Sequence, residues 1–214
     1  MPHSELRGIY CIVDEDVAAA PLALLDGVLA AGVRLVQYRA KHGVDRDVVL
    51  KMLAKTRAAG ATLVVNDDLE AALVADGVHL GQEDLASLDA SSLRARLGDK
   101  ILGISCSTVA EAHDAERIGA DYLGVGPYAV TASKGDAGAP IGASGVNAIV
   151  TATRLPVAAI GGIEVAILDD VVHSGARMAA VISAIARGPD ARANARQFVE
   201  RWNALDSATN ASSR

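Results

Sequence analysis

Aromatic residues are scarce in this sequence, at only 3% of 214 residues, although hydrophobic residues make up 51%. A large core must therefore consist of Val, Ile, Leu and Ala, and bulky aliphatics of this kind fill the interior of parallel β/α barrels. Positive charge is also limited: 20 Lys and Arg stand against 26 Asp and Glu, which gives a net charge of −6, and there is no basic run. This balance excludes general nucleic-acid binding, which needs an extended positive surface. A few placed groups must hold any anion that the protein binds.

Long apolar runs and cysteine clusters are missing as well. No stretch reaches the roughly 18 consecutive apolar residues of a membrane helix, and the short polar N-terminus does not resemble a secretory signal. The two cysteines, Cys11 and Cys106, each lie inside an apolar run. On opposite sides of a barrel they would exceed the ~7 Å between Cα atoms that a disulfide allows. We therefore expect two free thiols and a cytoplasmic protein, and with five His and no Cys/His cluster we expect no zinc site.

Eight short apolar runs alternate with amphipathic helical segments along the chain. The runs cover residues 9–13, 34–38, 62–65, 77–80, 101–106, 122–126, 157–160 and 179–183. Several of the helical segments end at glycine, the usual residue after a helix, namely at Gly32, Gly60, Gly98, Gly119 and Gly175. Strands that alternate with helices predict parallel pairing with right-handed crossovers.

We therefore predict one α/β domain, a parallel eight-stranded (β/α)8 TIM barrel over residues 8–205, with flexible termini at residues 1–7 and 206–214. An open doubly wound sheet is the alternative, but the Gly-rich turn after its first strand is absent. Barrel enzymes carry their chemistry at the carboxyl ends of the strands. The residues that follow each apolar run are therefore the candidate site.

Three polar residues follow the second run at a spacing of two. Gln37, Arg39 and Lys41 lie on the same face of an extended chain, so we expect an amide and two cations in the barrel mouth. A solvated strand end is the alternative. A planar guanidinium is well suited to bidentate contact with phosphate oxygens.

Carboxylates follow the third and fourth runs. Asn66-Asp67 comes after one and Gly81-Gln82-Glu83-Asp84 after the other, and we expect Asp67 and Asp84 to form a site for a hard cation such as Mg²⁺. A helix N-cap is the alternative for Asn66-Asp67. His79, flanked by aliphatics, is expected to be structural or to support the site indirectly.

The last four strand ends add hydroxyls, glycines and one lysine. Ser105 lies at the end of the fifth run and is expected to line the mouth. The long segment after the sixth run has the composition of a lid that brings Thr131, Ser133 and Lys134 onto a substrate. Gly161-Gly162 and Ser183 follow the seventh and eighth runs, where barrels often bind phosphate with backbone N–H groups.

In this order, these residues resemble the thiamine phosphate synthase family from Gly8 to about Leu205. The resemblance rests on Gln37-x-Arg39-x-Lys41, Val65-Asn66-Asp67, Gly77-Val78-His79-Leu80-Gly81-Gln82-Glu83-Asp84, Gly103-Ile104-Ser105, Gly119-Ala120-Asp121-Tyr122-Leu123-Gly124-Val125-Gly126-Pro127, Ala159-Ile160-Gly161-Gly162-Ile163 and Val181-Ile182-Ser183-Ala184-Ile185. The family joins hydroxymethylpyrimidine diphosphate to hydroxyethylthiazole phosphate and releases pyrophosphate, with Mg²⁺.

The resemblance implies a role for each candidate residue. Asp67 and Asp84 would hold Mg²⁺ on the diphosphate, and Arg39 and Lys134 would neutralise its oxygens as the diphosphate leaves. The residues expected around the pyrimidine diphosphate are Gln37, Arg39, Lys41, Asn66, Ser105 and Lys134, and of these the resemblance implies that Arg39, Lys134 and Ser105 are catalytic. Those expected around the thiazole phosphate are Thr131, Ser133, Gly162, Ile182 and Ser183. The implied partners are small phosphorylated molecules, with no nucleic acid and no membrane, and a homo-oligomer stays open.

Two other functions fit part of the pattern. A thiazole tautomerase has a similar barrel but needs neither Mg²⁺ nor a diphosphate site, and a non-catalytic phosphate-binding barrel would need only the last two strand ends. The family lid usually reads Pro-Thr-x-Thr-Lys, whereas this chain has Val130-Thr131-Ala132-Ser133-Lys134. The hydroxyl of the second Thr is kept in Ser133, but the fixed φ of proline is lost at Val130.

Overall fold

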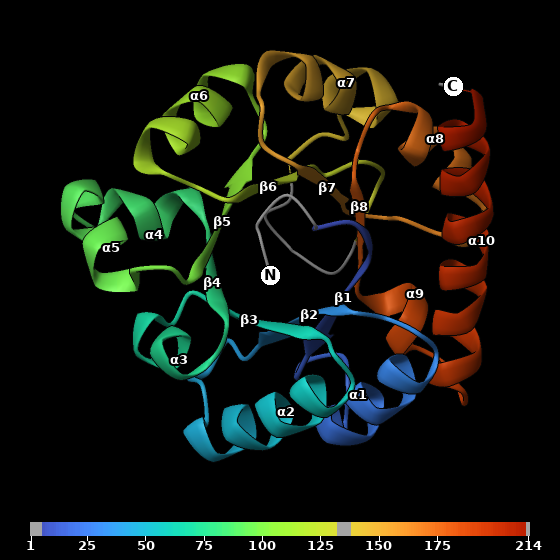
Figure 1. The fold of residues 1–214 in the computed structure, drawn as a ribbon, viewed down its shortest axis with the longest axis horizontal. Coiled ribbons are helices and arrows are strands. Elements are labelled where there is room, and N and C mark those ends of the chain that lie inside the picture. The colour runs from blue at the N-terminus through green and yellow to red at the C-terminus, as the bar shows by residue number, and fades with distance from the viewer. Residues whose placement is uncertain (1–5, 132–137, 213–214) are drawn as a thin grey trace.

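The eight strands of this computed structural model close into one parallel barrel, with neighbours in chain order from β1 to β8 (Figure 1). The structure describes residues 6–131 and 138–212. Every strand overlaps the apolar run that predicted it, so the predicted barrel is confirmed. The strands are β1 Gly8–Asp14, β2 Leu35–Arg39, β3 Thr62–Asn66, β4 Gly77–Leu80, β5 Ile101–Cys106, β6 Tyr122–Val125, β7 Val157–Ile160 and β8 Met178–Val181.

Helices surround the barrel, and Figure 1 shows them as an outer ring. The five predicted C-terminal glycines all have positive φ, from 56° at Gly98 to 102° at Gly32, a backbone conformation that favours glycine. The helices are α1 Pro21–Ala30, α2 Arg46–Ala58, α3 Leu69–Val74, α4 Gln82–Ala86, α5 Ala90–Leu97, α6 Val109–Ile118, α7 Gly142–Ala152, α8 Leu168–His173, α9 Ser183–Ala186 and α10 Ala191–Ser212, with a 3₁₀ turn η2 at Val165–Ile167.

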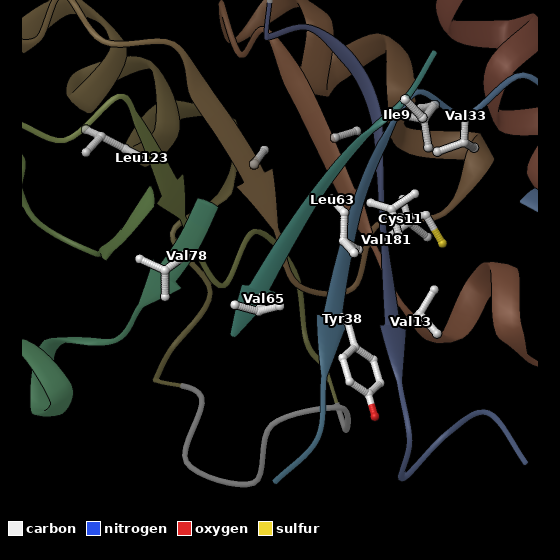
Figure 2. Packing of buried hydrophobic residues seen from close by; sticks show 14 of the residues in the cluster. Ile9, Cys11, Val13, Val33, Tyr38, Leu63, Val65, Val78, Leu123 and Val181 are labelled. Carbon is white, nitrogen blue, oxygen red and sulfur yellow. The ribbon is translucent and has the colours of Figure 1, made fainter. Parts of the chain in front are cut away.

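Successive residues of each strand serve two separate cores. Side chains that point outward pack between the strands and the helices, and Figure 2 shows several of them along the strands, among them Cys11, Val13 and Leu63. Side chains that point inward fill the barrel, with Tyr10 and Tyr122 as its large members. This alternation follows from the period of two along a strand. Because the inner core ends below the strand tips, the mouth above it is left for other side chains.

The C-terminal helix α10 packs along α1 and α8 and buries Phe198 and Trp202. It continues past Asp206 to Ser212, through part of the segment that we expected to be flexible. Asp206 forms an ion pair with Arg7, which ties this helix to the start of the barrel. None of the helices within the described residues combines the length and the hydropathy that a membrane crossing requires.

Candidate active site

A cavity of about 680 Å³ opens at the carboxyl ends of the strands, and residues from all eight strand ends line it. This volume lies within the usual range for small-molecule sites. Its lining is divided: charged and amide groups come from the β2, β3 and β4 ends, whereas the β7 and β8 ends supply aliphatic side chains. The polar group comprises Arg39, Asn66, Asp67, Glu83 and Asp84, and the aliphatic group comprises Ala158, Ile160, Ala180 and Ile182. The cavity can thus hold a highly charged group on one side and a flat, less polar group on the other.

The three polar residues at the end of β2 do not all lie at the cavity. Gln37 is buried, with 2% of its surface exposed, and lines the cavity together with Arg39. The Nη1 atom of Arg39 lies 2.5 Å from Oδ2 of Asp14, a buried carboxylate whose other oxygen accepts from the backbone N–H of Asp16 at 2.9 Å. Lys41 is absent from the described cavity lining and instead forms an ion pair of 2.8 Å with Asp16. The structure therefore brings Gln37 and Arg39 together and places Lys41 outside them.

Asp67 has an unusual backbone conformation at the end of β3. Its φ is 61°, in the left-handed region that few residues other than glycine adopt. The helix N-cap that Asn66-Asp67 suggests falls on the next residue, because the side chain of Asp68 accepts from Ala71 N at 2.8 Å. Asp67 is thus released from capping, and its carboxyl group accepts from the Asn66 amide and faces the cavity.

The Asp67 carboxyl group meets that of Asp84. Partial desolvation is the main cause that raises the pKa of Asp67 to about 6, and the hydrogen bond and charge of Asp84 raise it further; Arg39 and the backbone N–H of Gly81 oppose them. Asp84 is itself fixed, since its Oδ2 accepts from Gly81 N at 3.1 Å. Two carboxyl groups this close form a site of strongly negative potential once both are ionised.

The Asp67–Asp84 pair fits a hard divalent cation. Oxygen donors are the ligands that Mg²⁺ prefers, and one or two carboxylates are enough when phosphate and water complete its shell. No group of three His, Cys, Asp or Glu side chains that could enclose a metal occurs among the described residues. The donor set is therefore suited to a cation that arrives with a phosphorylated ligand.

Below this pair, a chain of hydrogen bonds crosses the barrel. The Gln37 amide nitrogen lies 2.9 Å from Tyr10 Oη, and Tyr10 Oη lies 2.7 Å from Tyr122 Oη. Tyr122 Oη lies 3.0 Å from Nδ1 of His79, whose Nε2 lies 2.9 Å from Ser105 Oγ. All five residues except Tyr122 line the cavity. His79 is 8% exposed and contacts Ser105, and its expected indirect role stays a prediction.

The residues expected to bind phosphate at β7 and β8 lie at the cavity or directly beside it. Ile182 lines the cavity, and Ser183 begins the short helix α9 directly behind it. Gly162 has a φ of 66° and packs against the backbone of Ala129 and Val130. Its neighbour Gly161, rather than Gly162 itself, is among the cavity-lining residues.

The segment after β6 reaches the cavity through Thr131. Ser133 and Lys134 lie outside the described residues, so their predicted roles stay predictions. The side chain of Val130 is 85% exposed, which separates it from the cavity and the core.

Tyr10, Tyr122 and Asp14 were not singled out from the sequence. The period of two could have found Tyr10 and Tyr122, because it places them on the same inward face as Ile12 and Gly124. Asp14 could be found only with the β1–β2 register, which pairs Asp14 with Arg39.

Comparisons with known proteins relate this chain to one family. A family model described as thiamine monophosphate synthase matches residues 9–185. A thiamine-phosphate synthase of Chloroflexus aurantiacus is 43% identical over 89% of this chain and 90% of its own length. A thiamine-phosphate synthase of Moorella thermoacetica is 46% identical over 84% of this chain and 87% of its own length. The solved structure of a thiamine phosphate pyrophosphorylase from Pyrococcus furiosus superposes with a TM-score of 0.84 at 30% identity, and covers 92% of this chain and 96% of that one.

Proposed function

The chain belongs to the thiamine monophosphate synthase family, and from this premise we propose how its barrel mouth carries out the reaction. It is an enzyme of thiamine biosynthesis, a transferase that releases pyrophosphate. In our proposal hydroxymethylpyrimidine diphosphate and hydroxyethylthiazole phosphate bind side by side in the cavity. The observation that carries the proposal is the Asp67–Asp84 pair together with Arg39 on the polar side of the cavity.

The diphosphate is assigned to that polar side. Asp67 and Asp84 would hold Mg²⁺, which when bound supplies positive charge to the diphosphate oxygens. Arg39 would contact the same oxygens, and its ion pair with the buried Asp14 restricts the guanidinium to the cavity edge. Lys134 would add a second cation from the lid. Lys41 would act only in an arrangement that frees it from Asp16.

The proposed reaction has two steps: the diphosphate departs, and the thiazole nitrogen captures the cation that remains. The bond between the pyrimidine methylene carbon and the diphosphate oxygen breaks, and its electron pair leaves on the diphosphate. The thiazole nitrogen donates its lone pair to the resulting cation and forms the new C–N bond. Arg39 and Lys134 stabilise the leaving charge, while Gln37, Asn66 and Ser105 orient the pyrimidine. The aliphatic wall of the cavity keeps water from the cation.

No enzyme nucleophile takes part in this scheme. Cys106 lines the cavity, but burial raises the pKa of its thiol to about 12, so the thiolate is not formed at neutral pH. Ser105 donates a hydrogen bond to neither carboxylate in the described contacts, and its Oγ faces His79 as part of the chain below the mouth. Positioning and charge stabilisation are therefore the contributions of the protein.

The thiazole phosphate is assigned to the other side of the mouth. The backbone around Gly162, Ile182 and Ser183 would hold its phosphate, and the hydroxyls of Thr131 and Ser133 would close over it. The position of Ile182 and Thr131 at the cavity supports this assignment. We place the enzyme in the cytoplasm, because Cys11 and Cys106 are both free and buried.

Pyrophosphate release on mixing both substrates with Mg²⁺ tests the proposal, with EDTA as the control. We expect Asp67→Ala and Lys134→Ala to lower kcat by about 10²-fold or more, which is typical when a charge-stabilising group is lost. The thermal midpoints of both variants should stay close to wild type. Asp26→Ala, which removes an exposed carboxylate paired with Lys55, is the matched control and should keep full activity.

Two results would contradict the proposal. Isomerisation of a thiazole carboxylate phosphate without Mg²⁺ or pyrophosphate release would identify a tautomerase. Binding of both phosphorylated compounds without turnover would identify a non-catalytic barrel.

A further inference from the structure

The hydrogen-bond chain below the mouth has one consistent direction. The Gln37 amide nitrogen can only donate, so Tyr10 Oη accepts from it. The hydroxyl hydrogen of Tyr10 must then go to its other described partner, Tyr122 Oη at 2.7 Å. Tyr122 in turn donates to Nδ1 of His79, and the hydrogen on Nε2 donates to Ser105 Oγ. The hydroxyl hydrogen of Ser105 is left for the cavity.

The opposite direction leaves a buried hydroxyl without an acceptor. If Nδ1 of His79 carried the hydrogen, Tyr122 would accept from it and would donate to Tyr10. Tyr10 would then accept from both Gln37 and Tyr122, and its own hydrogen would have no acceptor among its described contacts. Tyr10 lines the cavity but is only 1% exposed, so its hydroxyl has little access to water.

Two inward-facing glycines make room for this chain. A Cβ on Gly103 would lie 2.1 Å from the ring of Tyr122, and a Cβ on Gly124 would lie 2.8 Å from Cε1 of His79. The rings of Tyr10 and Tyr122 meet edge to face, with centroids 5.8 Å apart. The chain is therefore held by close packing as well as by its hydrogen bonds, and burial raises the pKa of both phenols so that they keep their hydrogens.

The two ends of the chain present opposite polarity to the cavity. Gln37 gives its amide nitrogen to Tyr10, which leaves its carbonyl oxygen as the acceptor for a ligand. Ser105 accepts from His79, which leaves its hydroxyl as the donor. An aminopyrimidine edge carries an amino donor beside a ring nitrogen lone pair, the complementary pattern. The corresponding 4-oxo pyrimidine reverses both, with a carbonyl acceptor beside a ring N–H.

We propose that Tyr10, Tyr122 and His79 are positioning residues that fix Ser105 as a donor and Gln37 as an acceptor, and thereby select an aminopyrimidine over its oxo analogue. The proposal rests on the function proposed above, since it concerns the same pyrimidine. Its basis is the buried chain rather than any residue that would touch the diphosphate or the metal.

The experiment uses the full chain with Tyr122→Phe, in which Nδ1 of His79 loses its hydrogen-bond donor. We expect kcat/KM for the aminopyrimidine diphosphate to fall by about tenfold to a hundredfold, the value of a lost buried hydrogen bond. KM for the thiazole phosphate should stay within about twofold, because its site lies elsewhere in the mouth. The preference for the aminopyrimidine over the 4-oxo analogue, measured by competitive inhibition, should fall by a similar factor.

Two further variants separate direction from packing. Tyr38→Phe is the matched control: Tyr38 is equally buried, but its hydroxyl donates to Glu15 outside the cavity lining, and the substrate preference should not change. Tyr10→Phe keeps the hydrogen bond from Tyr122 to His79 but removes the acceptor of the Gln37 amide, so it should lower the preference through Gln37 alone and leave the hydrogen on Nε2 of His79.

Nitrogen-15 NMR of the wild-type His79 ring gives a readout that does not depend on the variants. We expect the hydrogen on Nε2 in wild type and a mixture of tautomers in Tyr122→Phe. A wild-type ring with its hydrogen on Nδ1 alone, or an unchanged substrate preference in Tyr122→Phe, would overturn the proposal. An inactive wild type would instead overturn the proposed function, so the two failures are distinguishable.

Discussion

At the scale of single residues, Asp67 combines a strained backbone with a carboxyl group that faces another carboxyl. A left-handed φ costs a non-glycine residue about 1 kcal/mol or more. The proximity of Asp84 adds an electrostatic cost once both groups are ionised. These costs are the expected mark of a position kept for binding rather than for stability.

Asp67→Asn should therefore stabilise the metal-free protein at pH 8. Asparagine tolerates the left-handed conformation and removes one charge of the pair. The pKa of Asp67 is raised to about 6 from its ordinary value of 3.8, so a proton on Asp67 stabilises the folded protein. This stabilisation is fully present below pH 3.8 and is lost as the pH rises through 6. Because solvent screens part of this interaction, Asp67→Asn should gain about 1 kcal/mol in free energy of unfolding, or about 2–4 °C in thermal midpoint.

The same measurement at several pH values checks the cause. The difference between Asp67→Asn and wild type should be constant above pH 6 and should narrow as the pH falls toward 4. In saturating Mg²⁺ the wild-type protein should become more stable than Asp67→Asn, since only wild type keeps both carboxylates. A gain that does not depend on pH would point to the backbone alone.

At the scale of elements, the segment between β6 and α7 is attached to the end of β7 near its start and to its own first residues near its end. Tyr128 N donates to Ile160 O at 2.7 Å, and Ala129 N donates to Gly161 O at 2.9 Å. At the far end, Ile141 N donates to Pro127 O at 2.9 Å. The start of the proposed lid is thus a short extension of the sheet, and its contact with β7 passes through glycine.

Gly162→Ala should displace this extension. Its φ of 66° strains any side chain, and the added Cβ would lie 2.5 Å from Val130 O. Gly60→Ala is a close control, because Gly60 has a φ of 64° and nothing within 4 Å of the added Cβ. We expect Gly60→Ala to cost about 1 kcal/mol and Gly162→Ala about 2–3 kcal/mol by denaturant unfolding.

The kinetics of the two glycine variants should differ as well. KM for the thiazole phosphate should rise about tenfold in Gly162→Ala, the effect of losing about 1.4 kcal/mol of binding. It should not change in Gly60→Ala. Equal effects of the two substitutions would show that the strain of positive φ, and not the contact with Val130, is what matters.

Strand positions and the inward or outward direction of side chains could be predicted from the sequence because both follow from short-range patterns. Asn66, Asp67 and Ser105 were placed at the mouth on that basis. The pairing of Asp14 with Arg39, Glu15 with Tyr38 and Asp16 with Lys41 could not be predicted. It depends on the β1–β2 register, which no local pattern fixes.

At the scale of the whole molecule, the barrel separates stability and chemistry between its two ends. Opposite the mouth, Arg94 donates to the carbonyl of Gly119 at 3.2 Å, to that of Gly98 at 2.8 Å and to Oδ2 of Asp121 at 3.0 Å. Asp121 also accepts from Leu102 N at 2.7 Å. These contacts join the starts of β5 and β6, at the end of the barrel opposite the site.

Arg94→Met should lower stability without altering catalysis. The loss of several hydrogen bonds to partly buried acceptors should cost about 2–3 kcal/mol by denaturant unfolding. kcat and KM for both substrates should stay within about twofold, because the mouth is formed by the other end of each strand. Arg96→Met on the same helix removes only an exposed ion pair with Glu70 and should cost less than about 0.5 kcal/mol. A matching loss of activity in Arg94→Met would show that the two ends are coupled.

The glycines at 103 and 124 also limit the order in which this sequence can change. While Tyr122 occupies the space beside Gly103, no side chain can be accepted there, and the same holds for Gly124 while His79 stays. Gly103 is therefore contingent on a residue of the neighbouring strand β6, and Gly124 on a residue of β4, two strands away. A descendant of this chain could fill either position only after its large partner had been replaced. Substitutions at each glycine and at its partner are therefore coupled in evolution.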